Sequence, residues 1–512
     1  MAIDSRKGLI ACIAATLVVR VWVAVTFPAL NEEAEYWGWS QHLAAGYRKG
    51  PPMVAWMIAA FDWLGTIHRE LALRMASLLC GLATLGLVYL LALRLFANRE
   101  VARFSVLLAC AIPLLQAIGV LMVPDAPAVA FSLAAMAFFW IAVTHQQPVF
   151  WLLCGAALGL ATISKLGAIL ILPAFIVHLA TSTPHRASLR RAGPWLALIA
   201  AIAVALPFAL WNADHSWATI THEIAQRSVK GFNVRPIKLL EALLEQALGT
   251  AVLLFVPLIA FLFAPLGSTP ESWRKPLRFL KVQSGVVFAF FFTVALVIEV
   301  HPQDLLPGYP PAVIGIAAML VAMPKDRVWR FTRRAIAPCI ALSLGIGVIA
   351  ALGQGVFARL DAGRFGKALG EKIAVAQLRL YGWPDLGRQL SVRLKDYPEA
   401  GRGAFFTCRR RHAAALSFHL RGTPVIDLTA ITLRARAEGA ALLADRELQS
   451  LDGRDGLYFC SAREVGMGNL HEVFTDITQL DSIDVHYRGA VIGTFEVSRA
   501  TGLRLKGFVP ER

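Results

Sequence analysis

The segment GLIACIAATLVVRVWVAVTF, residues 8–27, is followed directly by PALNEEAEYWGWSQHLAAGYRKGPPMVAW, residues 28–56. The first segment is apolar and reaches the length of about 20 residues that crosses the hydrocarbon core of a membrane. It is too long for the core of a signal peptide and lacks a clear small-residue cleavage site, so we expect a retained anchor. The second segment places three carboxylates among aromatic residues, which predicts a polar site at the membrane surface.

The composition of the whole chain is that of a membrane protein. Its 512 residues are 57% hydrophobic and 16% charged, with a mean hydropathy of +0.59, whereas soluble proteins carry about 25% charged residues. The net charge of +16 could suggest a nucleic-acid partner. Most basic residues, however, lie in short loops between apolar runs, as the positive-inside rule requires of cytoplasmic loops. We therefore expect a lipid bilayer as partner and no nucleic acid.

Eleven apolar runs approach or reach the length of a membrane span. They fall at 8–27, 71–93, 104–121, 126–144, 149–163, 167–181, 194–211, 243–265, 282–300, 309–323 and 335–353. The fifth and sixth runs are short and could form one bent pair, so we expect about eleven transmembrane helices. With the N-terminus inside, the inner loops hold about seventeen Lys and Arg residues and the outer loops about eight, which favours this orientation.

From about residue 355 the composition changes, and a separate domain is predicted. Strand-like pieces fall at 403–407, 424–428, 456–460 and 490–497, and helical periodicity fits 411–420 and 365–380. We expect a multi-pass domain over 1–354 and a small α/β domain over 355–512. An odd number of spans puts the second domain outside. Only Cys408 and Cys460 lie in this polar part, where they could form a disulfide.

The unusual polar residues gather on one side of the predicted topology. Five separate loops deliver them to the non-cytoplasmic face. Ionisable residues at the membrane edge are costly and usually functional, so the pattern indicates one site there. These residues are Glu32, Glu33, Glu35, Asp125, Lys165, Asp214, His215, Glu299, His301 and Asp304.

The first external loop, about 28–70, carries the acidic residues. A carboxylate there can act as general base on an acceptor hydroxyl. Glu32 and Glu33 are neighbours and cannot point the same way from a helix, whereas Glu32 can share a face with Glu35 or Tyr36. A solvated loop with a Trp anchor is the alternative interpretation.

Three later motifs each have a functional and a structural interpretation. In MVPDAPAV, Asp125 is a site carboxylate or an ordinary helix cap. In ISKLGAI, Lys165 either reaches to the interface or pairs with an anion such as a lipid phosphate. In EVHPQDLLPGYPPAV, the residues His301, Asp304 and Tyr309 could face the site, or the segment is only a proline-rich entry to a helix. WNADHSW is interpreted as an interfacial anchor.

Taken together, these motifs resemble a known family. With EEAEYWGWSQHLAAGYRKGPPMVAW, GLATISKLGAILILPAF and YGWPDLG, the chain resembles glycosyltransferases of the dolichyl-phosphate-mannose protein mannosyltransferase type. The bacterial group includes the lipid A aminoarabinose and lipopolysaccharide galacturonic acid transferases. The resemblance implies a GT-C-like fold and aligns Glu32 and Glu33 with an Asp-Glu pair. Glu32 replaces the usual Asp, and Gly50 stands where many members have His.

The resemblance implies an inverting enzyme of the bacterial inner membrane. It would move a sugar from a polyprenyl-phosphate donor to a lipid-linked glycan, lipopolysaccharide, lipid A or protein acceptor on the periplasmic face. Glu32 would be the general base, with Glu33 and Asp125 orienting the acceptor. Lys165 would neutralise the departing phosphate. No cofactor is certain; for a divalent metal ion the candidate ligands are Glu32 and Asp125.

The remaining candidates for binding phosphate or substrate are Lys49, His301, Asp304, Tyr309 and Tyr36. Two other functions stay open. A transporter or flippase for a polyprenyl lipid would share the hydrophobicity, but it usually shows repeated halves and broken spans, which the sequence does not. A non-catalytic, lipid-binding homologue in a glycan-assembly complex is favoured only by the departures at Glu32 and Gly50.

Overall fold

The computed structural model describes residues 6–227, 235–267, 269–353, 357, 367–395, 404–420, 425–428, 452–461, 470–487 and 489–504. The chain forms two compact units. The first comprises Met1–Thr26 with Ala44–Ala351, and the second comprises Phe27–Leu43 with Leu352–Arg512.

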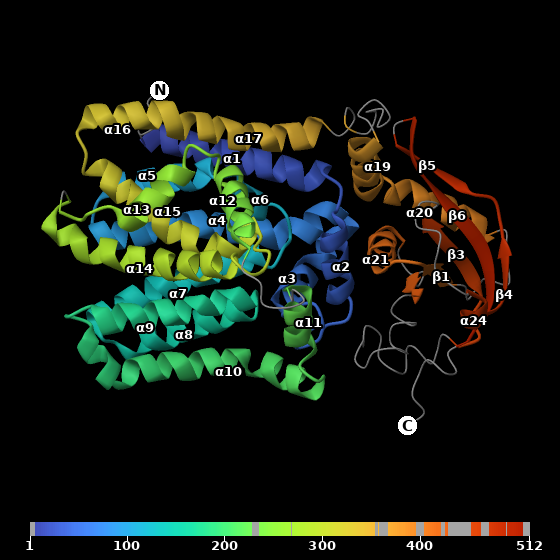
Figure 1. Cartoon of the computed structure of the whole chain (residues 1–512), viewed down its shortest axis with the longest axis horizontal. Helices are drawn as coiled ribbons and strands as arrows, with labels where there is room; N and C mark the ends of the chain where they lie inside the picture. Colours follow the sequence, from blue (N-terminus) through green and yellow to red (C-terminus); the bar gives the residue numbers. More distant parts are fainter. Residues whose placement is uncertain are drawn as a thin grey trace. The chain divides into compact units, whose positions relative to one another are not determined.

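The first unit is a bundle of helices (Figure 1). Among the described residues, seven helices are long and apolar enough to cross a membrane. They are α1 (Arg6–Thr26), α4 (Arg69–Phe96), α7 (Asp125–His145), α10 (Ala192–Asp214), α14 (Glu271–Val294), the pair η4 (Pro302–Gly308) and α15 (Tyr309–Val321), and the run α16 (Lys325–Phe331), η5 (Thr332–Ile336) and α17 (Ala337–Leu352). The chain is therefore a multi-pass membrane protein.

Shorter helices complete the unit. They are α3 (Met53–Phe61), η1 (Asp62–Thr66), α5 (Arg99–Ala111), α6 (Pro113–Ile118), α8 (Pro148–Thr162), η2 (Leu166–Leu170), α9 (Ile171–Thr181), η3 (Arg186–Arg190), α11 (Ala218–Arg227), α12 (Pro236–Gly249) and α13 (Phe255–Phe263).

The structure does not confirm the count of eleven long spans. Two of the expected runs form the shorter helices Pro148–Thr162 and Leu166–Thr181, and two others are broken. The run 104–121 divides into α5 and α6 at Pro113, which lacks the N–H that a continuous helix would use. The run 243–265 divides into α12 and α13 around Ala251 and Val252, which both have positive φ. Hydropathy alone cannot detect either break, because both segments stay apolar throughout.

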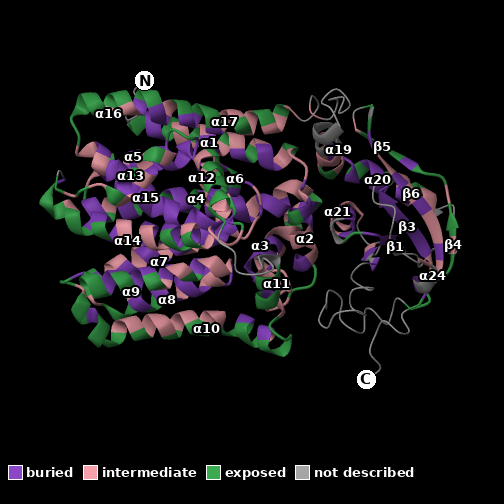
Figure 2. Ribbon diagram, in the orientation of Figure 1, coloured by how far each residue is buried: buried purple, intermediate pink, exposed green. Residues whose placement is uncertain are grey.

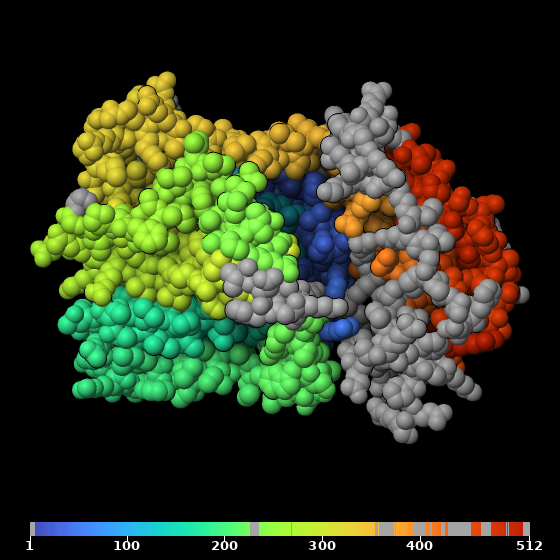
Figure 3. Space-filling view, in the orientation of Figure 1, coloured from blue at the N-terminus to red at the C-terminus, as the bar shows by residue number. Residues whose placement is uncertain are grey.

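The core of the first unit runs through α4, α5 and α15 (Figure 2). In the apolar stretch of Pro302–Val321, 89% of the residues are buried, whereas in that of α10 only 11% are buried. A helix that is apolar all round and still exposed is suited to lipid rather than to water. On the face seen in Figure 3, residues 148–214, 236–294 and 325–352 form much of the surface of this unit.

The second unit contains a mixed sheet, which confirms the expected small α/β domain. The strands are β1 (Ala404–Thr407), β2 (Val425–Asp427), β3 (Gly456–Ser461), β4 (Phe474–Gln479), β5 (Ile483–Tyr487) and β6 (Ala490–Leu503). Their order is β2-β1-β3-β6-β4, with β5 also paired to β6. β1 is parallel to β2 and β3, and β6 is antiparallel to its three neighbours.

The helices of the second unit are α2 (Asn31–Ser40), α19 (Lys367–Tyr381), α20 (Trp383–Lys395), α21 (Arg410–His419) and α24 (Leu470–Val473). Helix α2 comes from the acidic loop after the first span, and its Trp37 packs edge-on against Phe418 of α21 at 5.5 Å between ring centroids. A disulfide joins Cys408 to Cys460, at a Cα–Cα distance of 5.5 Å.

Candidate functional site

The side chain of Lys165 lies between two buried carboxylates. Its Nζ is 2.8 Å from Asp125 Oδ1 and 3.0 Å from Asp304 Oδ1, and it donates to the Gln303 carbonyl oxygen at 3.3 Å. The Asp125 and Asp304 side chains are only 9% and 4% exposed. An ammonium group has three N–H donors, and these three acceptors can use all of them. We call Asp125, Lys165 and Asp304 the carboxylate–lysine cluster.

Three helix boundaries build this cluster. Asp125 is the first residue of α7, and Lys165 lies where the chain passes from α8 to η2. Asp304 lies in η4, where its Oδ2 accepts a hydrogen bond from the His301 N–H at 3.2 Å. The structure thus brings together residues that the sequence had singled out in three separate motifs. Asp304 has a capping role as well, because its Oδ2 caps the start of η4 while its Oδ1 contacts Lys165. Asp125, for which a helix cap was the alternative interpretation, makes no side-chain cap hydrogen bond at the start of α7.

With both carboxylates ionised and Lys165 protonated, the cluster has a net charge of −1. Burying ionised groups is favourable only when they are well paired, and here each carboxylate has the lysine within 3.0 Å. Lys165 must therefore release one acceptor before it can bind a phosphate oxygen. In this structure the contact between Lys165 and Asp125 fixes the position of the Asp125 carboxylate.

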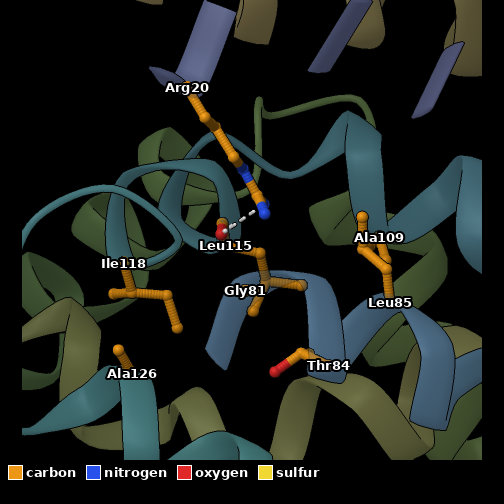
Figure 4. A pocket seen from close by; sticks show the side chains of 8 residues that line it. All are labelled: Arg20, Gly81, Thr84, Leu85, Ala109, Leu115, Ile118 and Ala126. Carbon is orange, nitrogen blue, oxygen red and sulfur yellow. Dashed lines mark hydrogen bonds between the residues drawn. The ribbon is translucent and has the colours of Figure 1, made fainter. Parts of the chain in front are cut away.

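Two residues that the sequence analysis did not single out hold the segment before Asp125. Arg20 of α1 is 3% exposed and donates to Gln116 Oε1 at 2.9 Å and to the Leu115 carbonyl oxygen at 3.2 Å (Figure 4). Ser77 of α4 donates to the Leu121 carbonyl oxygen at 2.8 Å. The available signal was an arginine in the middle of the first apolar run, because such a charge needs internal partners.

Two glycines make room for the Arg20 guanidinium. A Cβ added to Gly119 would lie 2.4 Å from Arg20 Cζ, and one added to Gly81 would lie 2.6 Å from Nη1. A cavity of about 10 Å³ adjoins this point (Figure 4). Arg20 Nη1 has no hydrogen-bond partner among the described residues, and the cavity is about the size that one water molecule needs.

The basic pair of the first loop lies at the tip of a tight turn. Tyr47 and Gly50 exchange backbone hydrogen bonds of 3.1 Å in both directions, so Arg48 and Lys49 form the two-residue tip. Thr219 Oγ1 donates to the Tyr47 carbonyl oxygen at 2.7 Å, which ties this turn to α11. Burial raises the pKa of the Tyr47 hydroxyl above its ordinary value. Lys49 is half-buried at this tip.

The WNADHSW segment does more than anchor the chain at the interface. A Cβ on Gly46 would lie 2.4 Å from Trp211 Cε3, so the turn that carries Lys49 packs closely on this indole ring. The ring of His215 stacks on Trp211 with 4.1 Å between centroids. The segment therefore supports the turn that carries the basic pair.

The acidic residues of α2 differ from one another in their surroundings. Glu33 is fully buried, and its Oε2 accepts a hydrogen bond from the Leu30 N–H at 3.1 Å, which stabilises the start of α2. Glu32 is exposed on the same helix, as expected for sequence neighbours that point in different directions. The Tyr36 ring packs edge-on against Trp39 at 5.1 Å.

The remaining candidates lie in the first unit. His301 is exposed at the start of η4. Tyr309 is 1% exposed; its hydroxyl donates to Gln246 Oε1, and its ring lies 5.5 Å from that of Phe288. These contacts place Tyr309 in the helix core and give no contact between it and Lys165.

The described part of the chain holds no group of three or more His, Cys, Asp or Glu residues suited to a metal ion. Glu32 belongs to the second unit and Asp125 to the first, so their assignment as metal ligands stays a prediction.

Comparison with known proteins agrees with the fold. The family model described as dolichyl-phosphate-mannose-protein mannosyltransferase matches residues 49–211, a range that includes Asp125 and Lys165. The lipid A galacturonosyltransferase RgtD of Rhizobium johnstonii is 27% identical over 299 residues. That match spans 57% of this chain and 61% of the relative, so the chain matches less than two thirds of its length.

Two solved structures share the fold over nearly the whole chain. ArnT from Cupriavidus metallidurans in the apo state has a TM-score of 0.62 at 16% identity and covers 98% of this chain and 99% of its own. The same protein bound to undecaprenyl phosphate has a TM-score of 0.62 at 17% identity, covering 97% and 98%. The chain thus has the fold of ArnT, and the predicted resemblance to transferases of the dolichyl-phosphate-mannose-protein mannosyltransferase type agrees with its similarity to that family model over part of its length and to RgtD.

Proposed function

We propose that the protein is a membrane glycosyltransferase that moves a sugar from a polyprenyl-phosphate donor to lipid A or another lipopolysaccharide acceptor. The observation that carries the proposal is the carboxylate–lysine cluster, buried at the ends of apolar helices. Two of its three residues lie in the segment matched by the family model. The acceptor class is taken from the relative named as a lipid A galacturonosyltransferase, and the donor class from the ArnT complex with undecaprenyl phosphate.

The reaction is an inverting displacement. The acceptor hydroxyl oxygen bonds to the anomeric carbon, the bond from that carbon to the phosphate oxygen breaks, and polyprenyl phosphate leaves with the electron pair. A carboxylate takes the hydroxyl proton, and we assign this role to Glu32, which is exposed. Asp125, held by Lys165, orients the acceptor, and Lys165 or Lys49 neutralises the leaving phosphate.

We further propose that the N-terminus is cytoplasmic and that the C-terminal domain lies in the periplasm. The charge of the loops supports this orientation. The Cys408–Cys460 disulfide is an independent support, because disulfides persist in oxidising compartments such as the bacterial periplasm and are rare in the cytosol.

Mass spectrometry of cell-envelope glycolipids tests the proposal. A strain that lacks the protein should lose one sugar-sized mass from its lipopolysaccharide, and wild-type protein should restore it. Asp125→Asn and Glu32→Gln should each fail to restore it, because each removes a carboxylate with an assigned role.

The matched control is Glu271→Gln, which removes an exposed carboxylate at the start of α14 and should restore the glycolipid fully. Unchanged glycolipids in the deletion strain would remove the transferase proposal and favour the transporter or the scaffold. Full rescue by Glu32→Gln would transfer the base role to another carboxylate.

A further inference from the structure

A basic hollow lies at the start of the last long apolar run. It is about 660 Å³ in volume and is lined by Asp326, Trp329, Arg330, Arg333 and Arg334. Ligand sites in proteins commonly measure about 300–1,000 Å³. The hollow belongs wholly to the first unit and contains none of the residues assigned to catalysis.

The side chains of the hollow are arranged in a defined way. Arg330 Nη2 is 2.7 Å from Asp326 Oδ2, and Arg333 Cζ lies 5.3 Å from the centre of the Trp329 ring. These contacts hold two guanidinium groups in place. Arg334 is exposed and has no carboxylate partner among the described residues. Three guanidiniums and one carboxylate leave the hollow with a net charge of +2.

The backbone widens where the arginines lie. Residues Thr332–Ile336 form a π-helical turn between α16 and α17, and such turns are frequent at functional sites. Trp329 is 58% exposed near the start of the apolar run, which is where the aromatic belt lies at a membrane–water interface.

The surface farther along the same run is suited to acyl chains. Leu342, Ile346, Ile349 and Leu352 of α17 are between 48% and 70% exposed. Their spacing of three and four residues places them along one side of the helix. The run thus combines a cationic, aromatic end with an apolar, exposed side.

We propose that this hollow binds the headgroup of an anionic phospholipid with two phosphates, whose acyl chains lie along α17. Guanidinium groups bind phosphate oxygens in a bidentate manner, and the charge of +2 matches two phosphodiesters. The positive-inside rule accounts for basic residues in this loop, but it does not require three arginines around one hollow with a stacked indole. The proposal is independent of the glycosyltransferase function.

Native mass spectrometry of the purified full-length protein tests the site. The probes are tetraoleoyl cardiolipin, zwitterionic dioleoyl phosphatidylcholine, and the cardiolipin headgroup without acyl chains. Arg333→Gln/Arg334→Gln should weaken cardiolipin binding about 30-fold, since each cation near a lipid surface contributes on the order of a five-fold factor.

The matched control is Arg186→Gln/Arg190→Gln, which removes two exposed arginines of η3 and should leave cardiolipin binding unchanged. An equal loss in both double variants would overturn the site and show only a generally basic face. Equal binding of phosphatidylcholine would overturn the requirement for an anionic lipid. Binding of the bare headgroup as tight as that of cardiolipin would identify a free-phosphate site instead.

Discussion

Lys165 compensates two buried carboxylates, so its removal should affect folding as well as activity. Lys165→Met leaves Asp125 and Asp304 facing each other without a cation, and breaking a buried pair typically costs about 3–5 kcal/mol. We expect a clearly lower unfolding temperature for the purified protein in detergent. The triple variant Lys165→Met/Asp125→Asn/Asp304→Asn should recover most of the stability without recovering activity. A single variant as stable as the wild type would show that the cluster is not ionised as described.

Gly119 tests whether Arg20 is held as tightly as the structure shows. The φ of Gly119 is −78°, so alanine fits its backbone and only the contact with Arg20 Cζ opposes the substitution. Gly119→Ala should therefore destabilise the protein by about 1–3 kcal/mol, as other overpacked cores do. Gly86→Ala on α4 is the control, because its Cβ would meet nothing within 4 Å. Thermal unfolding of both variants is the measurement, and an equal change in unfolding temperature for Gly119→Ala and Gly86→Ala would contradict the tight packing of Arg20.

Asp385 gives the second unit a pH dependence with a defined sign. Burial opposes ionisation, but hydrogen bonds from the His486 N–H and from the Arg388 and Gln389 side chains outweigh it and lower the pKa of Asp385 below its ordinary value. The stabilisation is therefore complete above the unfolded-state pKa of about 3.9 and is lost as the pH falls through the lower folded-state pKa.

Asp385→Asn should accordingly weaken the second unit at pH 7, and the difference from wild type should shrink below about pH 4. The measurement is the denaturant concentration at which β5 loses half of its protection, monitored by the hydrogen exchange of residues 483–487. The control is Asp481→Asn, which removes an exposed carboxylate just before β5. A difference that stays constant with pH would contradict the assignment.

At the level of elements, the disulfide fixes the centre of the sheet. Cys408 follows β1 and Cys460 lies in β3, and the loop between them spans 52 residues. Closing such a loop stabilises a fold by about 4 kcal/mol in the chain-entropy model. We expect both thiols to resist maleimide in intact membranes and to react after reduction and unfolding. Cys408→Ser should make Cys460 reactive in unfolded protein without reductant. Peptide mass spectrometry separates these two labelling sites from the five free cysteines of the chain, and label on Cys408 or Cys460 of unreduced, unfolded wild type would refute the bond.

The sequence predicted elements where the apolar pattern is strong and missed them where it is weak. β1, β3, β6 and α21 contain enough apolar or alternating residues to be recognised. β4 and β5 were not expected. FTDITQ carries several charged and polar residues, and IDVHY alternates apolar and polar residues over only five positions. Glu33, a predicted site carboxylate, also occupies the third position of α2, which is a capping position.

The residues of the carboxylate–lysine cluster could be singled out from the sequence, but their contacts could not. Asp125, Lys165 and Asp304 were each singled out from sequence, because charge is rare beside apolar runs. Which acceptors use the three N–H groups of Lys165 depends on the turns at 163–166 and 301–304. Apolar periodicity carries no information on turn geometry. The supporting role of Arg20 depends on the absence of side chains at Gly81 and Gly119.

At the scale of the whole molecule, the orientation can be tested with reporter fusions. The distribution of basic loops predicts a cytoplasmic N-terminus, and an odd number of spans would then place the C-terminus in the periplasm. Alkaline phosphatase fused after Arg512 should be active, and the same reporter fused after Ser188 should be inactive. Green fluorescent protein at the two positions should give the opposite pattern. Active phosphatase after Ser188 would reverse the orientation.

The second unit is discontinuous in sequence, and this has a consequence for how the protein is made. Helix α2 leaves the ribosome early, but its packing partner α21 begins 370 residues after Ser40. At synthesis rates of about 5–20 residues per second, α2 waits roughly 20–70 s for that partner. The nascent chain must therefore protect Trp37 and its neighbours at the membrane surface until translation is nearly complete. A chain that stops before residue 352 never supplies the partner.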